Sequence, residues 1–189
     1  MDDYIKQLEL LIKEEKIQEA RTALARFKSL APGERHRAIE VLALAPDKMA
    51  LDLLDFLLDS GECDGDTTQA LFQLVIDRAH LHYPFVLVLL KHGDPERIRH
   101  SIPLFKHILT KATGQDLLDR IIRTAGTLGL DTLIDEIAEF VFYDDPVLKS
   151  SAIRTLERLG TDKARKKLEL IAATEKADQD VLDALAFLK

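Results

Sequence analysis

Two stretches of the sequence, 31 positions apart, decide the fold. Residues 122–131 read IRTAGTLGLD, and residues 153–162 read IRTLERLGTD. Six of the ten aligned pairs are identical, namely Ile, Arg, Thr, Leu, Gly and Asp. Each stretch leads into a second segment whose apolar residues also recur at helical spacing. A repeat of this length is typical of a helix pair that cannot bury its own apolar face and stacks on a copy of itself.

The rest of the chain predicts further helices of the same kind. We expect them near residues 3–14, 17–30, 34–44, 47–58, 67–81, 95–111, 115–128, 132–142, 146–159, 163–173 and 180–188, with an apolar helix starting at Tyr83. Pro103 should kink or split the helix over 95–111, because it removes a backbone hydrogen bond. Asp66 is expected to cap the helix over 67–81. The sequence thus predicts an all-α protein, a right-handed α-solenoid of about six stacked antiparallel helix pairs.

We expect residues 1–189 to form a single domain of this kind. Residues 1–30 are predicted to form an N-terminal capping helix pair, and residues 115–175 contain the clearest repeats. When the helices are counted in pairs from both ends of the chain, the helix over 67–81 has no partner. Either residues 59–82 form an irregular unit, or this helix packs out of phase with the repeats. The C-terminal helix lacks a following partner, and its apolar surface suits self-association or a further repeat.

The repeat pattern resembles HEAT repeats, particularly the short bacterial form also seen in phycobilisome lyases. The resemblance is carried by Asp145-Pro146, Ala152-Ile153, Leu156, Leu159-Gly160 and Asp162, and by Leu128-Gly129 and Asp131 in the preceding unit. Gly129 and Gly160 suit the left-handed conformation that ends a helix, and Asp131 and Asp162 suit the start of the next one. The resemblance implies a concave surface that binds a protein or peptide; a minority of such proteins are enzymes.

The charge, apolar runs and cysteine content of the chain favour some partners and cellular compartments over others. The net charge of −7 and the pI near 5.4 argue against nonspecific binding to nucleic acid or to an anionic membrane. The longest apolar run, residues 85–90, is far shorter than the roughly 20 residues of a membrane-spanning helix. Cys63 is the single cysteine, and the acidic N-terminus is unlike a signal peptide. We therefore expect a cytoplasmic protein.

Repeated arginines give the best candidate for a binding surface. Arg123 and Arg154 occupy equivalent positions in successive repeats, with Arg120 and Arg158 about one helical turn away. Stacked repeats would place these side chains in a ladder that suits an acidic peptide or a phosphate. The alternative is that these arginines pair with neighbouring acids such as Asp119, Asp131 or Glu157. The sequence leaves both interpretations open.

Histidines and acids offer weaker candidates. Five histidines fall within 28 residues: His80, His82, His92, His100 and His107. No Asp or Glu stands at metal-ligand spacing beside them in the sequence, so we predict no metal and no cofactor. Residues 59–66 are rich in acids but lack the spacing of an EF-hand. The acidic neighbours of Cys63 disfavour an activated thiolate.

The sequence therefore predicts a non-catalytic protein–protein interaction scaffold that presents a HEAT-repeat surface to a protein or peptide partner. The alternative is a HEAT-like enzyme, a lyase or a metal-dependent one, centred on the histidine-rich segment 80–107. A HEAT-like DNA glycosylase is disfavoured, because the chain is acidic and contains no tryptophan.

Overall fold

Helices are the regular secondary structure of the chain. The computed structural model describes residues 2–60, 64–111, 114–174 and 179–188, and no β-strand occurs among them. The predicted all-α class is therefore confirmed. The chain divides into two compact units, Met1–Gly93 and Asp94–Lys189, which we describe one at a time. That residues 1–189 form one continuous solenoid domain stays a prediction.

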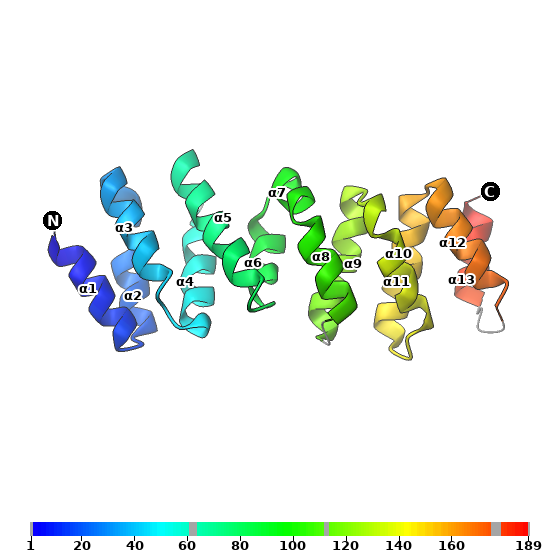
Figure 1. Cartoon of the computed structure of the whole chain (residues 1–189), viewed down its shortest axis with the longest axis horizontal. Coiled ribbons are helices and arrows are strands. Elements are labelled where there is room, and N and C mark those ends of the chain that lie inside the picture. The colour runs from blue at the N-terminus through cyan, green and yellow to red at the C-terminus, as the bar shows by residue number, and fades with distance from the viewer. Residues whose placement is uncertain (1, 61–63, 112–113, 175–178, 189) are drawn as a thin grey trace. The chain divides into compact units, whose positions relative to one another are not determined.

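Six α-helices build the first unit within its described residues. They are α1 (Asp2–Lys13), α2 (Ile17–Leu24), α3 (Pro32–Leu42), α4 (Asp47–Asp59), α5 (Gly65–Ala79) and α6 (Phe85–His92), with a short 3-10 helix η1 (Phe27–Ser29). Each helix contacts the next but one, so that α1, α3 and α5 form one layer and α2, α4 and α6 the other (Figure 1). The apolar stripe of each helix is buried by this alternation.

The second unit has the same alternation. Its described residues form α7 (Pro95–His100), α8 (Ile102–Lys111), α9 (Gln115–Leu128), α10 (Ile134–Glu139), α11 (Pro146–Leu159), α12 (Asp162–Ala172) and α13 (Gln179–Phe187), with 3-10 helices η2 (Asp131–Leu133) and η3 (Phe140–Phe142). Contacts join α8 to α10 and α10 to α12, and they join α9 to α11 and α11 to α13 (Figure 1). The helices of the second unit thus alternate between two layers, as those of the first unit do.

The helices of each unit can be counted in pairs. Ser101 separates α7 from α8, and Pro103 is the second residue of α8, as the predicted split requires. If α7 and α8 are counted as one broken helix, the described residues hold three helix pairs in each unit. The helix over 67–81 is not left over, because α5 packs on α6 as well as on α3. The last helix, α13, packs on both α11 and α12.

The two glycines predicted to end helices do so, whereas the three aspartates predicted to cap the starts of helices do not. Gly129 and Gly160 adopt left-handed conformations with φ of 66° and 58°, which ends α9 and α11. Asp64, two residues earlier than the predicted Asp66, caps α5 by accepting a hydrogen bond from the Thr67 amide at 2.8 Å.

Asp131 and Asp162, which follow the two glycines in the sequence, do not cap the next helices either. Thr161 caps α12 by accepting from the Ala164 amide at 3.3 Å, so Asp162 is the first helical residue instead. Asp131 begins the 3-10 helix η2, which has no side-chain cap. Both acids still lie in the first turn of their helices, where the helix dipole favours negative charge.

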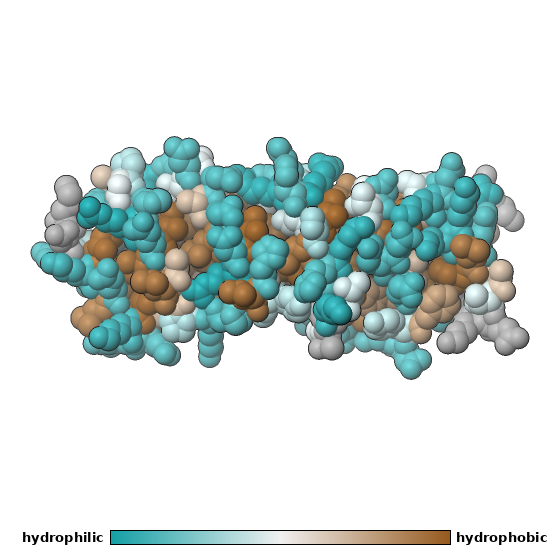
Figure 2. Space-filling view, in the orientation of Figure 1, coloured by the Kyte–Doolittle hydropathy of each residue, from teal (hydrophilic) through white to brown (hydrophobic). Residues whose placement is uncertain are grey.

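Hydrophilic side chains cover most of the face drawn in Figure 2, and apolar residues show mainly between them. The described residues contain no helix that is long and apolar enough to cross a membrane. Large apolar side chains that remain exposed include Leu44, Leu81, Leu170 and Phe187. Phe187, at the end of α13, is 79% exposed, which is the apolar surface expected of the C-terminal helix. Self-association through it stays a prediction.

Truncation of Leu156 tests the packing of α11. Its side chain is fully buried between helices, so we expect Leu156→Ala to lower the free energy of unfolding by about 2–5 kcal/mol. Leu170→Ala removes the same atoms from a side chain that is 66% exposed and should change stability by less than about 0.5 kcal/mol. Urea unfolding of both variants measures the difference. Equal losses would contradict the assignment of the core.

Asp135 tests the contact between α10 and α12. Lys163 and Lys167 hold its carboxylate at 2.6 and 2.8 Å, and their hydrogen bonds lower the pKa of Asp135 to about 2. Because this pKa is below the ordinary value of 3.8, the stabilisation is complete above that value and is lost as the pH falls towards 2. Asp135 is half exposed, so the effect should be within about 1 kcal/mol.

We therefore expect Asp135→Asn to be less stable than the wild type at neutral pH, and the difference to shrink in acid. Urea unfolding at pH 7 and at the lowest pH where the wild type stays folded measures it. Asp144→Asn serves as the control, because Asp144 is exposed and has no ion pair among the described residues. A difference that stays constant across this range would refute the ion-pair account.

Candidate functional site

The most extensive helix contact of the second unit lies between α9 and α11. At Gly126, a Cβ atom would lie 3.2 Å from Thr155 Cγ2 and 3.4 Å from Thr155 Cα. The Thr155 hydroxyl donates a hydrogen bond to the Ile122 carbonyl at 3.1 Å and is buried there. A glycine on one helix and a hydroxyl bonded to the backbone on the other therefore bring the two helices together. Their outward side chains share one groove as a result.

This groove has a volume of about 520 Å³. Its lining residues are Arg123, Thr127, Pro146, Val147, Ser150, Ser151, Arg154, Thr155 and Arg158. Three of the four arginines predicted to form the binding surface, Arg123, Arg154 and Arg158, thus lie in one place. Arg120 is exposed on α9 but is not part of the lining. We call this feature the arginine groove.

Arg123 is held by an acid of its own helix. Its Nε lies 3.0 and 2.9 Å from the two carboxylate oxygens of Asp119, and the Ser151 hydroxyl donates to the same carboxylate. Asp119 is only 17% exposed, so this ion pair is partly shielded from solvent. The interpretation that the arginines pair with neighbouring acids therefore holds for Arg123.

The same interpretation does not hold for Arg154 and Arg158. Among the described residues, no carboxylate lies within ion-pair distance of either guanidinium. Arg158 Nη1 donates a long hydrogen bond of 3.4 Å to the Thr127 hydroxyl. Both side chains are exposed and lie one turn apart on α11, where like charges repel each other by a few tenths of a kcal/mol. An anion between them would remove this repulsion.

The N-terminus of α11 does not contribute free amides to the groove. Asp145 accepts hydrogen bonds from the Val147 and Leu148 amides at 2.9 and 3.1 Å. Gln115 on α9 donates to the same carboxylate at 3.2 Å. Recognition of an anion here thus depends on side chains, and the guanidinium groups are the charged ones.

Acids limit the groove on one side. Arg154 also lines a smaller depression of about 340 Å³, together with Glu157 and with Asp180 and Asp183 of α13. Carboxylates on that side repel a negative ligand. The part of the groove most favourable to an anion therefore lies between Arg154, Arg158 and α9.

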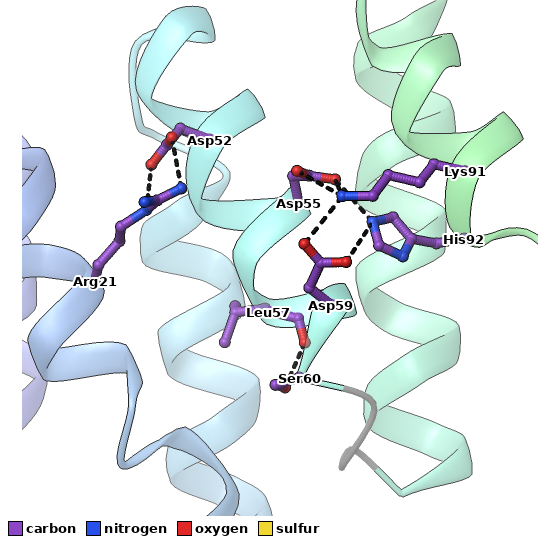
Figure 3. A network of polar contacts seen from close by, with 8 residues as sticks. All are labelled: Arg21, Asp52, Asp55, Leu57, Asp59, Ser60, Lys91 and His92. Atoms are coloured by element: carbon purple, nitrogen blue, oxygen red, sulfur yellow. Dashed lines mark hydrogen bonds and ion pairs between the residues drawn. The ribbon is translucent and has the colours of Figure 1, made fainter.

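A second polar cluster lies in the first unit, between α4 and α6 (Figure 3). Lys91 Nζ lies 2.9 Å from an oxygen of Asp55 and 2.9 Å from an oxygen of Asp59. His92 Nε2 lies 2.7 Å from Asp55, and the His92 side chain is only 11% exposed. The ligand atoms of Asp55, Asp59 and His92 lie within 4.8 Å of one another, which is a spacing that suits a metal ion. We call these four residues the α4–α6 cluster.

Lys91 already supplies the positive charge that this cluster needs. Burial raises the pKa of Asp55, but hydrogen bonds from His92 and Lys91 outweigh it and lower the pKa overall. Hydrogen bonds to Asp55 and Asp59 raise the pKa of Lys91. The lysine therefore remains an ammonium between two carboxylates, and the cluster ties α4 to α6. On the opposite side of α4, Arg21 of α2 binds Asp52 at 2.8 Å (Figure 3).

Three histidines of segment 80–107, namely His82, His92 and His100, make separate contacts. His82 binds Asp47 at 2.7 Å, and His100 Nδ1 contacts the Glu96 carbonyl at 2.8 Å. In the part of the chain that the structure describes, the α4–α6 cluster contains the single group with metal-ligand spacing, and His92 is its one histidine. Sequence reasoning missed Asp55 and Asp59; their i, i+4 spacing on α4 was the available signal.

The acidic stretch 59–66 is divided among different contacts. Asp59 binds Lys91, and Asp64 caps α5 and forms an ion pair with Arg35 of α3. Hydrogen bonds from Thr67 and the charge of Arg35 lower the pKa of Asp64. The carboxylates of Asp59 and Asp64 are therefore used within the fold. Cys63 lies outside the described residues.

Comparison with known proteins adds information about the fold alone. No protein-family model matches the sequence, and no curated protein matches it significantly. A crystal structure of an engineered protein is similar over 100% of this chain and 97% of its own, with 13% sequence identity and a TM-score of 0.50. The fold and the two polar sites define an all-α protein with a cationic groove, and this similarity does not assign a function to it.

Removal of Lys91 tests the α4–α6 cluster. Lys91→Met leaves Asp55 and Asp59 facing each other with His92 as their one cationic neighbour in the cluster, so we expect the melting temperature and the free energy of unfolding to fall. Lys48→Met is a matched control, because Lys48 is exposed on α4 and has no ion pair among the described residues. Thermal and urea unfolding measure both variants. If the two substitutions have equal effects, the cluster does not stabilise the helix contact.

Proposed function

We propose that the chain is a HEAT-like protein, a right-handed α-solenoid of about six helix pairs. Three observations support this proposal: the 31-residue repeat, the contact of each helix with the next but one in both units, and the left-handed glycines that end α9 and α11. Polar contacts between neighbouring helices of one layer have the same period. Arg21 binds Asp52 and Arg158 contacts Thr127, and each pair is 31 residues apart.

We further propose that the protein is a cytoplasmic, non-catalytic protein–protein interaction scaffold, and that its arginine groove binds an acidic segment of a partner protein. The observation that carries the proposal is that Arg154 and Arg158 have no carboxylate partner in a groove that Arg123 also lines. Charged groups that a fold needs for itself are normally paired, as Arg21, Lys91 and Asp135 are. Unpaired arginines on an acidic protein are available for a ligand.

Salt limits the distance over which the net charge of −7 repels an acidic partner. At physiological salt the screening length is about 8 Å, so the negative charge of the whole chain is screened beyond that distance. The guanidinium groups then dominate inside the groove. Because these contacts are exposed, binding should weaken as salt is added.

The alternative function is a HEAT-like lyase or metal-dependent enzyme centred on residues 80–107. The one observation that favours it is the spacing of Asp55, Asp59 and His92. A metal ion there would have to displace the Lys91 ammonium, which makes this the weaker candidate. Metal analysis of the purified protein tests it: stoichiometric zinc or iron that disappears in His92→Ala would favour the enzyme over the scaffold.

Charge reversal in the groove tests the scaffold proposal. The probe is a fluorescent peptide of alternating Glu and Ala, followed by fluorescence anisotropy at low salt. We expect the double variant Arg154→Glu, Arg158→Glu to bind it at least about tenfold more weakly, because two attractive charges become repulsive. Neither arginine has an ion pair to lose, so the melting temperature should stay close to the wild-type value.

The double variant Arg165→Glu, Lys166→Glu changes the net charge equally on α12, outside the groove. It should bind the peptide nearly as well as the wild type does. Equal loss in both double variants would attribute binding to net charge and would reject the groove as the site.

A further inference from the structure

The charge of the arginine groove matches a doubly charged anion. Asp119 forms an ion pair with Arg123, whereas Arg154 and Arg158 have no ion pair among the described residues. A glutamate or aspartate side chain brings a charge of −1. A phosphate monoester brings about −1.5 to −2 at neutral pH. The groove therefore fits one phosphorylated residue better than one carboxylate.

The number of hydrogen-bond acceptors leads to the same ligand. Residues four apart on a helix have Cβ atoms about 5–6 Å apart, so the forks of Arg154 and Arg158 can reach one group. One bidentate arginine engages both oxygens of a carboxylate, whereas a phosphate monoester has three terminal oxygens to share between two forks. Ser150 also lines the groove, and no hydrogen bond of its hydroxyl is recorded among the described residues. It can donate a further hydrogen bond.

The groove also has a surface for the residues beside the phosphate. Pro146 and Val147 line it at the start of α11, about two helical turns before Arg154, and Val147 is 43% exposed. A free phosphate ion would leave this apolar surface in water. A peptide would cover it with side chains a few residues away from the phosphorylated one.

We propose that the arginine groove recognises a phosphorylated side chain in a segment of a partner protein, held by Arg154 and Arg158. This proposal rests on the scaffold function above and names the chemical group that the groove selects. Asp180 and Asp183 of α13 repel the phosphate from beyond Arg154, so it lies on the side of Arg158 and α9. Arg123 stays bound to Asp119 and lines the same groove.

Three pools of short peptides with neutral, randomised flanks test the proposal. The central residue is phosphoserine in the first pool, glutamate in the second and serine in the third. We expect the phosphoserine pool to bind at least about tenfold more tightly than the glutamate pool at about 0.15 M salt, because charge-assisted hydrogen bonds are added. Anisotropy of labelled pools measures the affinities.

Variants assign the effect to the two arginines. Arg154→Gln and Arg158→Gln should each remove most of the preference for phosphoserine. Arg154→Lys and Arg158→Lys keep the charge but lose the fork, so they should bind both pools while the preference falls severalfold. Arg165→Gln, on α12 outside the groove, should leave the preference unchanged. Circular dichroism and melting temperatures check that each variant is folded.

The outcomes separate this proposal from the scaffold function. Equal binding of the phosphoserine and glutamate pools, both lost in the Gln variants, would overturn phosphate recognition and keep the acidic-segment groove. Binding of neither pool, or binding that ignores Arg154 and Arg158, would overturn both. Inorganic phosphate that displaces the phosphoserine pool at the peptide's own concentration would assign the groove to a free anion and overturn the peptide proposal.

Discussion

The close contact of α9 with α11 is the constraint on which the second unit depends. Because Gly126 has no side chain, Thr155 of α11 can lie close to α9. The Thr155 hydroxyl donates a hydrogen bond to the Ile122 carbonyl in the buried interface. A Cβ atom at position 126 would lie 3.2 Å from Thr155 Cγ2, so Thr155 would have to shift by a few tenths of an ångström. The groove above this contact exists because two helices of equivalent position, 31 residues apart in sequence, lie side by side there.

Charged side chains form ion pairs in the helix interfaces, whereas Arg154 and Arg158 in the arginine groove form none among the described residues. Between helices of one layer, cations and carboxylates are matched: Arg21 with Asp52, Lys91 with Asp55 and Asp59, and Lys163 with Asp135. These pairs stabilise helix contacts modestly and fix their register. Arg154 and Arg158 lie on the same kind of surface without such a match. This contrast distinguishes a binding surface from a solvated helix face better than the arginine content of the sequence does.

The sequence predicted the elements well and their mutual contacts poorly. Helical periodicity located the helices, Gly129 and Gly160 gave the ends of α9 and α11, and Pro103 indicated the break before α8, because these signals are local. The cap of α5 was wrong by two residues: Asp64 and Asp66 are equally suitable locally, and Arg35 of α3 contributes to the choice by binding Asp64.

The candidate site, too, could be predicted from the sequence only in part. The repeat put Arg123 and Arg154 in equivalent positions, which was enough to predict that they are near each other. The exclusion of Arg120 depends on how α9 is rotated against α11, and the pairing of Arg123 with Asp119 depends on Ser151 of the facing helix. Likewise, the proximity of His92 to Asp55 and Asp59 required knowing that α4 packs on α6. Such contacts are tertiary and have no local signal.

Nuclear magnetic resonance of the arginine Nε–H groups tests the central claim most directly, namely that Arg154 and Arg158 are free for a ligand while Arg123 is held. The Nε–H of Arg123 should exchange slowly with water, because Asp119 accepts its hydrogen bond. Those of Arg154 and Arg158 should exchange fast and should shift and slow when an acidic or phosphorylated peptide is added. Signals of Arg154 and Arg158 that are protected without ligand, or that ignore the peptide, would contradict the account.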